Sequence, residues 1–137
     1  MRITADTNLL LRTVLQDDER QSALADAVLK AATVIAVPSP VLCEFAWVLR
    51  RGYGYPNNEI AQAIKAICDL EAVVADQASV DLGLSILLAG GDFADGVIAQ
   101  QGRRLGGGTF ASFDEEAVSL LADQGVPADD PANMAVD

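Results

Sequence analysis

The stretch TVIAVPSPVLCEFAWVLRR, residues 33–51, decides the fold. It opens with a short run of β-branched and apolar residues at 33–37, which is typical of a parallel strand buried on both faces. Pro38 and Pro40 end this strand, and an apolar helical pattern runs from 40 to 51. A buried strand followed directly by a helix predicts one crossover unit of a parallel sheet.

The same alternation of strand and helix continues along the rest of the chain. We predict an α/β domain with a mostly parallel sheet that is covered by helices on both sides. Residues 1–124 should form this single domain with one core, and residues 125–137 an extended or frayed tail. The other expected strands are 2–5, 72–75 and 109–113, and the other expected helices are 9–15, 19–32, 58–70, 79–88, 95–104 and 114–123.

The composition is that of a globular protein and gives no sign of a membrane span. Of the 137 residues, 51% are hydrophobic and 21% are charged. The longest apolar candidate, residues 41–49, contains Glu44 and is shorter than the ~18–20 residues that a span requires. The first residues match neither a secretory signal nor a transit peptide. We therefore expect a soluble, cytoplasmic protein.

The absence of histidine excludes several catalytic chemistries. Ser-His-Asp and Cys-His arrangements, paired-histidine ribonucleases and imidazole-ligated zinc sites all need a residue that this chain lacks. Cys43 and Cys68 stand alone in apolar helical patterns, so we expect them to be core residues. The net charge of −11 repels nucleic acid. A polyanionic substrate would therefore need local compensation of this charge.

Two acids follow directly on predicted strands. Asp6 comes after the first strand and Asp114 after the last, where an open α/β sheet binds its ligands. The alternative is that both sites are helix N-caps. Residues 6–8 are all capping types, and Ser112 has the capping-box spacing to Glu115. The two interpretations are compatible, because capping by a hydroxyl would leave the carboxylate itself free.

Three further acids lie in apolar helical segments. Glu44 is the only polar residue of 41–49, which predicts a helix in the interior and a buried carboxylate. Such a carboxylate needs a metal or a partner, and Arg51 on nearly the same helix face is the alternative. Asp92 and Asp95, three residues apart, should share one side of a first helical turn, one of them as a cap. Oxygen ligands alone favour Mg²⁺ or Mn²⁺ over zinc or copper.

Four motifs follow one another along the chain: Asp6-Thr7-Asn8, Glu44, DFADGVIA at 92–99 and Ser112-Phe113-Asp114. In this order and spacing, they resemble the PIN domain, most closely the VapC ribonuclease toxins of type II toxin–antitoxin systems. The resemblance extends over residues 1–123 and implies a three-layer α/β/α fold with a central, mostly parallel sheet of four to five strands. Gly96 is a departure, because many relatives have alanine there.

The resemblance also implies a function. It implies an endoribonuclease in which Mg²⁺ or Mn²⁺ activates the water that hydrolyses an RNA phosphodiester bond. The implied partners are a cognate antitoxin protein and a second copy of the chain in a homodimer. The implied catalytic and metal-binding acids are Asp6, Glu44, Asp95 and Asp114, with Asp92 as an auxiliary metal ligand and Thr7, Asn8 and Ser112 as supporting residues.

Besides a bound cation, arginines are a means by which this acidic chain could attract RNA. Arg12, Arg50 and Arg51 are candidate phosphate contacts, and solvated charges at helix ends are the alternative for each. Tyr53 and Tyr55 lie in the loop that follows and are candidates for base stacking or for ordinary packing. The apolar residues around Trp47 are candidates for a dimer surface.

Two other functions remain as alternatives. One is a PIN-like module that binds a partner without catalysis. The other is a different Mg²⁺-dependent phosphotransfer enzyme, such as an aspartyl-phosphate phosphatase. Asn8 disfavours that second alternative, because those enzymes usually carry an acid two residues after the nucleophilic aspartate.

Overall fold

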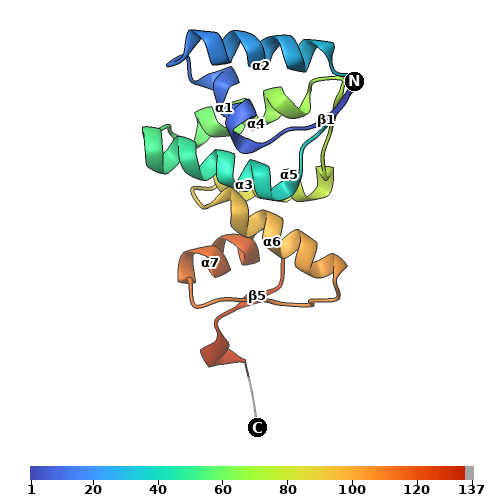
Figure 1. Cartoon of the computed structure of the whole chain (residues 1–137). Coiled ribbons are helices and arrows are strands. Elements are labelled where there is room, and N and C mark those ends of the chain that lie inside the picture. The colour runs from blue at the N-terminus through green and yellow to red at the C-terminus, as the bar shows by residue number, and fades with distance from the viewer. Residues whose placement is uncertain (135–137) are drawn as a thin grey trace. The chain divides into compact units, whose positions relative to one another are not determined.

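The computed structural model describes residues 1–134 and confirms the α/β class, with seven α-helices and five short strands among those residues (Figure 1). The chain divides into two compact units, Met1–Asp76 and Gln77–Asp137. That residues 1–124 form a single domain with one core stays a prediction.

The first unit is built on a three-stranded parallel sheet with β2 in the middle. Ile35 of β2 pairs with Ile3 on one side and with Val73 on the other. Ile35 is 1% exposed and Val37, just after the strand, is 2% exposed. Val34 and Ala36 on the other face are half-buried, so the strand predicted at 33–37 exists but is fully buried on one face only. Because the strands are parallel, their carboxyl ends share one edge, and Asp6 follows β1 there. The strands are β1 (Arg2–Thr4), β2 (Val34–Ala36) and β3 (Val73–Val74).

Four α-helices complete the first unit. In α4, Ile60, Ile64 and Ile67 repeat at the spacing of one helix face, and all three are buried. Helix α1 packs against α2 and α3. The last turn of the predicted helix 40–51 is a π-helix, η1, which continues α3. The helices are α1 (Thr7–Val14), α2 (Glu19–Ala31), α3 (Ser39–Trp47), η1 (Val48–Gly52) and α4 (Asn57–Cys68).

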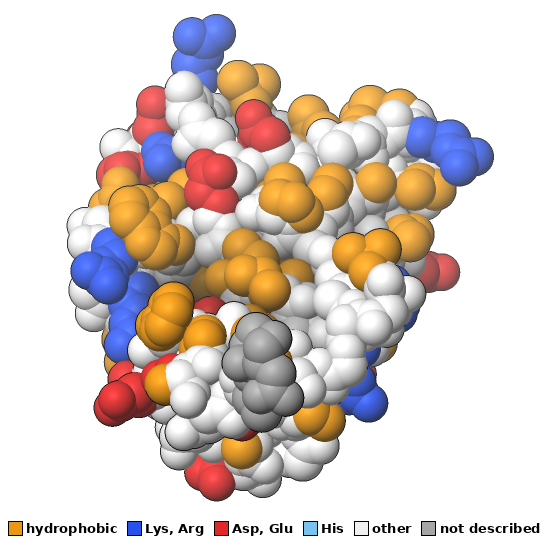
Figure 2. Space-filling model, turned by 90° about the horizontal axis from the view of Figure 1, so that it is seen from below, with side chains coloured by type: hydrophobic (Ala, Val, Ile, Leu, Met, Phe, Trp, Pro, Cys, Tyr) orange, Lys and Arg blue, Asp and Glu red, His pale blue; other side chains and the backbone are white. Residues whose placement is uncertain are grey.

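The surface mixes hydrophobic, acidic and basic side chains, as Figure 2 shows for one face. Cys43 and Cys68 are not joined in a disulfide, and both are half-buried. None of the helices within residues 1–134 combines the length and the apolar character that a membrane crossing requires.

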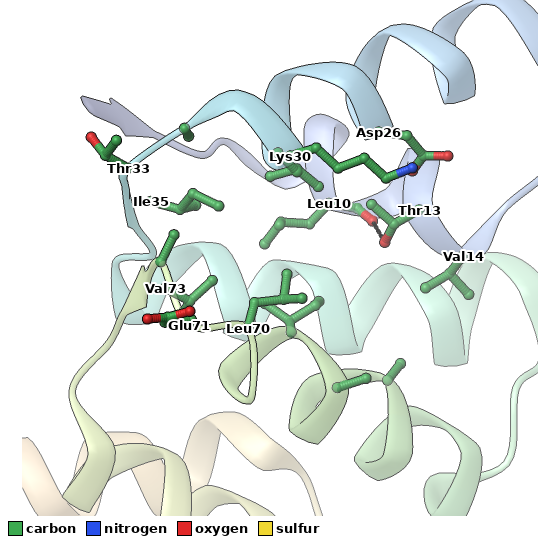
Figure 3. Close-up of a pocket in the computed structure, with 16 residues that line it drawn as sticks. Leu10, Thr13, Val14, Asp26, Lys30, Thr33, Ile35, Leu70, Glu71 and Val73 are labelled. Carbon is green, nitrogen blue, oxygen red and sulfur yellow. Dashed lines mark hydrogen bonds between the residues drawn. The ribbon is translucent and has the colours of Figure 1, made fainter. Parts of the chain in front are cut away.

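A pocket of about 830 Å³ opens within the first unit, between α1, α2, α4 and the adjoining strands (Figure 3). Leu10 and Ile35, each 1% exposed, contribute apolar surface to it. Asp26, Lys30 and Glu71 are the charged residues among those that line it. The pocket is thus mainly apolar and carries charges of both signs.

The second unit has its own core, formed by Ile86, Ala99, Leu121 and Val126. Strands β4 and β5 pair in parallel as a separate two-stranded sheet. Its elements are α5 (Gln77–Leu88), α6 (Phe93–Arg104), β4 (Phe110–Ala111), α7 (Glu115–Asp123), β5 (Ala128–Asp129) and the 3₁₀ turn η2 (Pro131–Asn133).

The predicted tail at 125–137 is part of this unit as far as the structure describes it. Val126 is 5% exposed in the core, and β5 pairs with β4. Asp130 caps η2 by accepting a hydrogen bond from the Ala132 backbone N–H at 2.8 Å. Residues 125–134 are therefore folded rather than frayed, and 135–137 lie outside the described residues.

Two glycines let α5 and α6 approach closely. A Cβ atom at Gly96 would lie 2.6 Å from the Gly83 Cα and 2.6 Å from the Leu82 carbonyl oxygen. A Cβ at Gly83 would lie 2.6 Å from the ring of Phe93. This contact gives Gly96 a packing role that outweighs its low helix propensity, and it fixes the first turn of α6.

We expect Gly96→Ala to lower the free energy of unfolding by about 1–3 kcal/mol, because the new methyl group meets backbone atoms that cannot rotate away. Gly102→Ala is the matched control in the same helix, since nothing lies within 4 Å of a Cβ there. That control should raise stability by up to about 1 kcal/mol through helix propensity. Urea titration monitored by circular dichroism measures both, and equal stabilisation by the two changes would contradict the close helix contact.

Candidate active site

The starts of two helices in the second unit carry the predicted acids of that unit. Asp92 is the N-cap residue of α6 and Asp95 lies in its first turn. Asp114 is the N-cap residue of α7. Asp95 is half-buried, whereas Asp92 and Asp114 are exposed. A helix start stabilises negative charge through its unpaired backbone N–H groups, so these positions suit carboxylates.

The Asp114 carboxylate has a defined orientation. Its Oδ1 accepts a hydrogen bond from the Ala117 backbone N–H at 3.1 Å, and its own backbone N–H donates to the Ser112 Oγ at 3.0 Å. The cap of α7 is therefore Asp114 itself, not a capping box of Ser112 and Glu115. The hydroxyl of Ser112 supports the turn that carries this acid.

The pKa of the Asp95 carboxyl group lies well above its usual value. Burial, as the largest cause, and the negative charges of Asp92, Asp114 and Glu116 together raise its pKa from 3.8 to about 6. The acids at the starts of α6 and α7 therefore lie near enough to Asp95 for their charges to affect its pKa. The favourable helix N-terminus is outweighed by desolvation and by like charge.

Glu116 belongs to this group, although it was not among the predicted site residues. Its charge contributes to the raised pKa of Asp95, and it lies in the first turn of α7, two residues after Asp114. In the sequence, only its position close to Asp114 pointed to this role. That position is not distinctive, because glutamates in the first turn of a helix usually stabilise the helix through its dipole.

The group around Asp95 fits a divalent cation by its chemistry. Among residues 1–134, no three histidine, cysteine or acidic side chains already stand in an arrangement that would hold a metal ion. The donors are all carboxylate oxygens, which Mg²⁺ and Mn²⁺ prefer. A bound cation would also remove the repulsion that raises the pKa of Asp95.

Asp6 occupies the corresponding position in the first unit, at the start of α1. Its Oδ1 accepts a hydrogen bond from the Leu9 backbone N–H at 2.9 Å, which confirms the predicted cap. Asp6 and Asn8 are exposed, and Thr7 is 9% exposed. Asp6 is thus a helix cap that remains accessible to a ligand.

Glu44 corrects one expectation. The apolar run 41–49 predicted an interior helix with a buried carboxylate, but Glu44 and Trp47 are exposed. Leu42 and Phe45, on the other faces of α3, are buried at 1% and 0% exposure. Glu44 is therefore solvated and needs no internal partner. That Asp6 and Glu44 join the group around Asp95 stays a prediction.

The predicted arginines divide into two kinds. Arg12 Nη1 lies 2.7 Å from the Asp17 Oδ1, and the Arg12 side chain is only 14% exposed. This ion pair favours a structural role for Arg12 in the connection from α1 to α2. Arg50 and Arg51 are exposed on η1, and their contact with a phosphate stays a prediction.

Comparison with known proteins identifies one family. The model described as PIN domain matches residues 3–121. No curated protein matches the chain. The matched region includes all the acids proposed for the site, from Asp6 to Asp114, and extends over most of both units.

Proposed function

The chain belongs to the PIN domain family, and on this basis we propose that it is a Mg²⁺- or Mn²⁺-dependent endoribonuclease. PIN domains are generally metal-dependent nucleases. The observation that supports this activity best is the raised pKa of Asp95, caused by burial and by three neighbouring carboxylates. A strongly perturbed acid with other acids nearby is typical of a catalytic site.

The proposed metal ligands are Asp95 and Asp114, joined by Asp6 and Glu44, with Asp92 as an auxiliary ligand. When bound, the cation supplies an activated water and neutralises charge on the phosphate. The chain's own residues hold the ligands in place. The Ala117 N–H and the Ser112 hydroxyl orient Asp114, and the glycine contact between α5 and α6 fixes the turn that carries Asp95.

Thr7 and Asn8 support the site in this proposal by shaping the start of α1 beside Asp6. Thr7 is 9% exposed and so is held by its surroundings, whereas Asn8 is exposed and can hydrogen-bond a ligand. Asp95 must lose its proton before it can bind a cation, which its pKa of about 6 allows near neutral pH.

We further propose that the biological role is that of a VapC-like toxin in the cytoplasm, active as a homodimer and neutralised by a cognate antitoxin. The motif order supports the toxin role: Asp6-Thr7-Asn8, then Glu44, then the helix start at 92–99, then Ser112-Phe113-Asp114. The acidic character of the site favours an antitoxin with a basic segment, because opposite charges complement each other.

A partner-binding module without catalysis is the second candidate function, and the pocket of the first unit is the observation that favours it. The pocket measures about 830 Å³, has apolar walls and carries Lys30 and Asp26 from α2 (Figure 3). Such a surface suits an apolar protein segment. Calorimetric titration with Mg²⁺ separates the two candidates, since a module without a metal site would give no binding heat.

The toxin role is tested by induced expression in bacterial cells. We expect the chain to arrest growth and to produce new RNA ends, and Asp6→Asn, expressed at the same level, to do neither. Sequencing of RNA fragment ends after induction identifies the cleaved molecules and positions. Continued growth with intact RNA, while the folded protein accumulates, would contradict the proposal.

A further inference from the structure

The end of α3 and the π-helix η1 carry an unusual surface. Trp47 is 63% exposed and Tyr53, just after η1, is 49% exposed. Arg51 is also exposed. Single exposed hydrophobic residues are common on proteins, but two large aromatic side chains beside an arginine form a specific combination. We call Trp47, Arg51 and Tyr53 the aromatic–arginine surface.

The spacing places this surface beside a proposed catalytic acid. Glu44, Trp47 and Arg51 are separated by three and four residues, so they follow one another along one helix face. In an α-helix such as α3, neighbouring positions three residues apart have Cβ atoms about 5–6 Å apart. Exposed Glu44 therefore has exposed Trp47 as its neighbour, and Arg51 continues the row.

The backbone at the helix end holds the surface in place. The Gly54 N–H donates to the Arg50 carbonyl at 3.0 Å, and the Tyr55 N–H donates to the Leu49 carbonyl at 3.0 Å. Leu49 itself is completely buried. These bonds close the π-helix and turn the chain, so Arg51 and Tyr53 are carried on an ordered segment. Single π-helical turns occur frequently at functional sites.

The local charge is opposite to that of the whole chain. No acidic residue occurs between Glu44 and Glu59, although the chain has 20 acids and a net charge of −11. Arg50 and Arg51 lie in this interval. It also holds the single tryptophan and both tyrosines of the sequence. The segment is thus basic and contains several aromatic residues, although the protein as a whole is acidic.

Charge decides between two classes of occupant. In a symmetric contact with a second copy, the same patch would face itself and bring Arg50 and Arg51 close to their equivalents. Glu44 is the one acid in the sequence from 44 to 58 and offsets only one of these two positive charges, so the approach remains unfavourable. An RNA strand supplies phosphates for the guanidinium and bases for the aromatic rings, which is how proteins bind single-stranded nucleic acid.

We propose that the aromatic–arginine surface binds single-stranded RNA, with Trp47 stacking on a base and Arg51 contacting a phosphate next to Glu44. This inference rests on the proposed ribonuclease function and adds the surface that holds its substrate. Tyr53 offers a second ring for a neighbouring base. Duplex RNA is a poor ligand for this surface, because its bases are already stacked and its major groove is narrow.

The sole tryptophan makes the test direct, since all tryptophan fluorescence comes from Trp47. Asp95→Asn protein in Mg²⁺ is titrated with a short fluorescein-labelled single-stranded RNA, so that cleavage does not disturb binding. We expect the RNA to quench Trp47 emission in parallel with the rise in fluorescein anisotropy. The same sequence as a duplex should bind more weakly and leave the emission nearly unchanged.

Variants in the same background separate stacking from charge. Trp47→Ala should weaken binding about tenfold, as the loss of one stacked base predicts, and Trp47→Phe should restore most of it. Leu24→Ala, another exposed apolar position in the first unit, is the matched control with unchanged affinity. Arg51→Gln should lower the slope of log affinity against log salt by about 0.7, as for one phosphate contact on a single strand. Arg20→Gln is its exposed control on α2.

Unquenched Trp47 emission, or equal RNA affinity for Trp47→Ala and Leu24→Ala, would overturn the proposal. So would a Trp47 emission shift on dilution without RNA, together with a lower sedimentation coefficient for Trp47→Ala, because a second copy then covers this surface. Cleavage by the wild-type chain is assayed separately. Binding through Trp47 without any cleavage would refute the ribonuclease proposal and leave the RNA surface intact.

Discussion

Replacing Asp95 by asparagine is expected to lower the rate of RNA cleavage by more than about a hundredfold, because even residues outside the ligand shell of a metal contribute about 10–100-fold. Asp95 is the central acid of the proposed site, because burial and the charges of Asp92, Asp114 and Glu116 raise its pKa. The neutral amide keeps the shape but is a weaker ligand for a hard cation. Initial rates on single-stranded RNA in millimolar Mg²⁺ measure the effect.

The same substitution should make the protein more stable near pH 7. The pKa of Asp95 is raised from 3.8 to about 6, so the folded state holds this proton more tightly than the unfolded state does. Stability is therefore lost as the pH rises through about 4 to 6, and the asparagine variant escapes that loss. We expect a gain of about 1–2 kcal/mol near pH 7, less than the full shift in pKa implies because water screens this half-buried side chain. The gain should disappear below pH 4. Inactivity with lower stability would instead indicate misfolding.

Glu115→Gln is the matched control for Asp95→Asn. Glu115 is exposed in the first turn of α7, next to Glu116, but it does not contribute to the raised pKa of Asp95. Cleavage by this variant should stay within about twofold of wild type, as expected for a surface charge in high dielectric. A large loss in Glu115→Gln would mean that overall negative charge, rather than the group around Asp95, governs the activity.

Removal of divalent cations is expected to abolish cleavage completely, and added Mg²⁺ or Mn²⁺ to restore it. The reason is that the chain offers no imidazole to activate water, so the proposed chemistry depends on the cation that the carboxylates hold. Dialysis against EDTA followed by titration with each cation measures the effect, and KCl of equal ionic strength serves as the control. Cleavage that persists in EDTA would contradict a metal-dependent mechanism.

The cation effect should also depend on pH. Protons compete with the cation for Asp95, so its affinity for Mg²⁺ should fall as the pH decreases below about 6. Thermal unfolding then shows whether Mg²⁺ binds the folded state. We expect Mg²⁺ to raise the melting temperature near pH 7 in wild type, and to have little effect near pH 4 or in Asp95→Asn.

Local chemistry was the part of the structure that the sequence predicted best. The helix caps at Asp6 and Asp114 and the buried strand around Ile35 follow from side-chain type and immediate neighbours. These features depend on interactions within a few residues, so a single sequence displays them. The α/β class follows from the same rhythm of strand and helix.

Tertiary context explains where prediction failed. The run 41–49 is apolar, but nothing in it reveals that Glu44 and Trp47 face solvent, because exposure depends on which elements pack nearby. Likewise Gly96 looked like a weak helix residue until the close approach of Gly83 gave it a packing role. The pairing of β5 with β4 was hidden because each strand is only two residues long.

The most direct test of the metal site is a crystal structure of the chain grown with Mn²⁺, using the anomalous scattering of the metal. We predict an anomalous peak within about 2.0–2.3 Å of carboxylate oxygens of Asp95 and Asp114, and in contact with Asp6. A manganese-containing crystal without a peak at Asp95, or with Asp6 too far away to share the ion, would contradict the account.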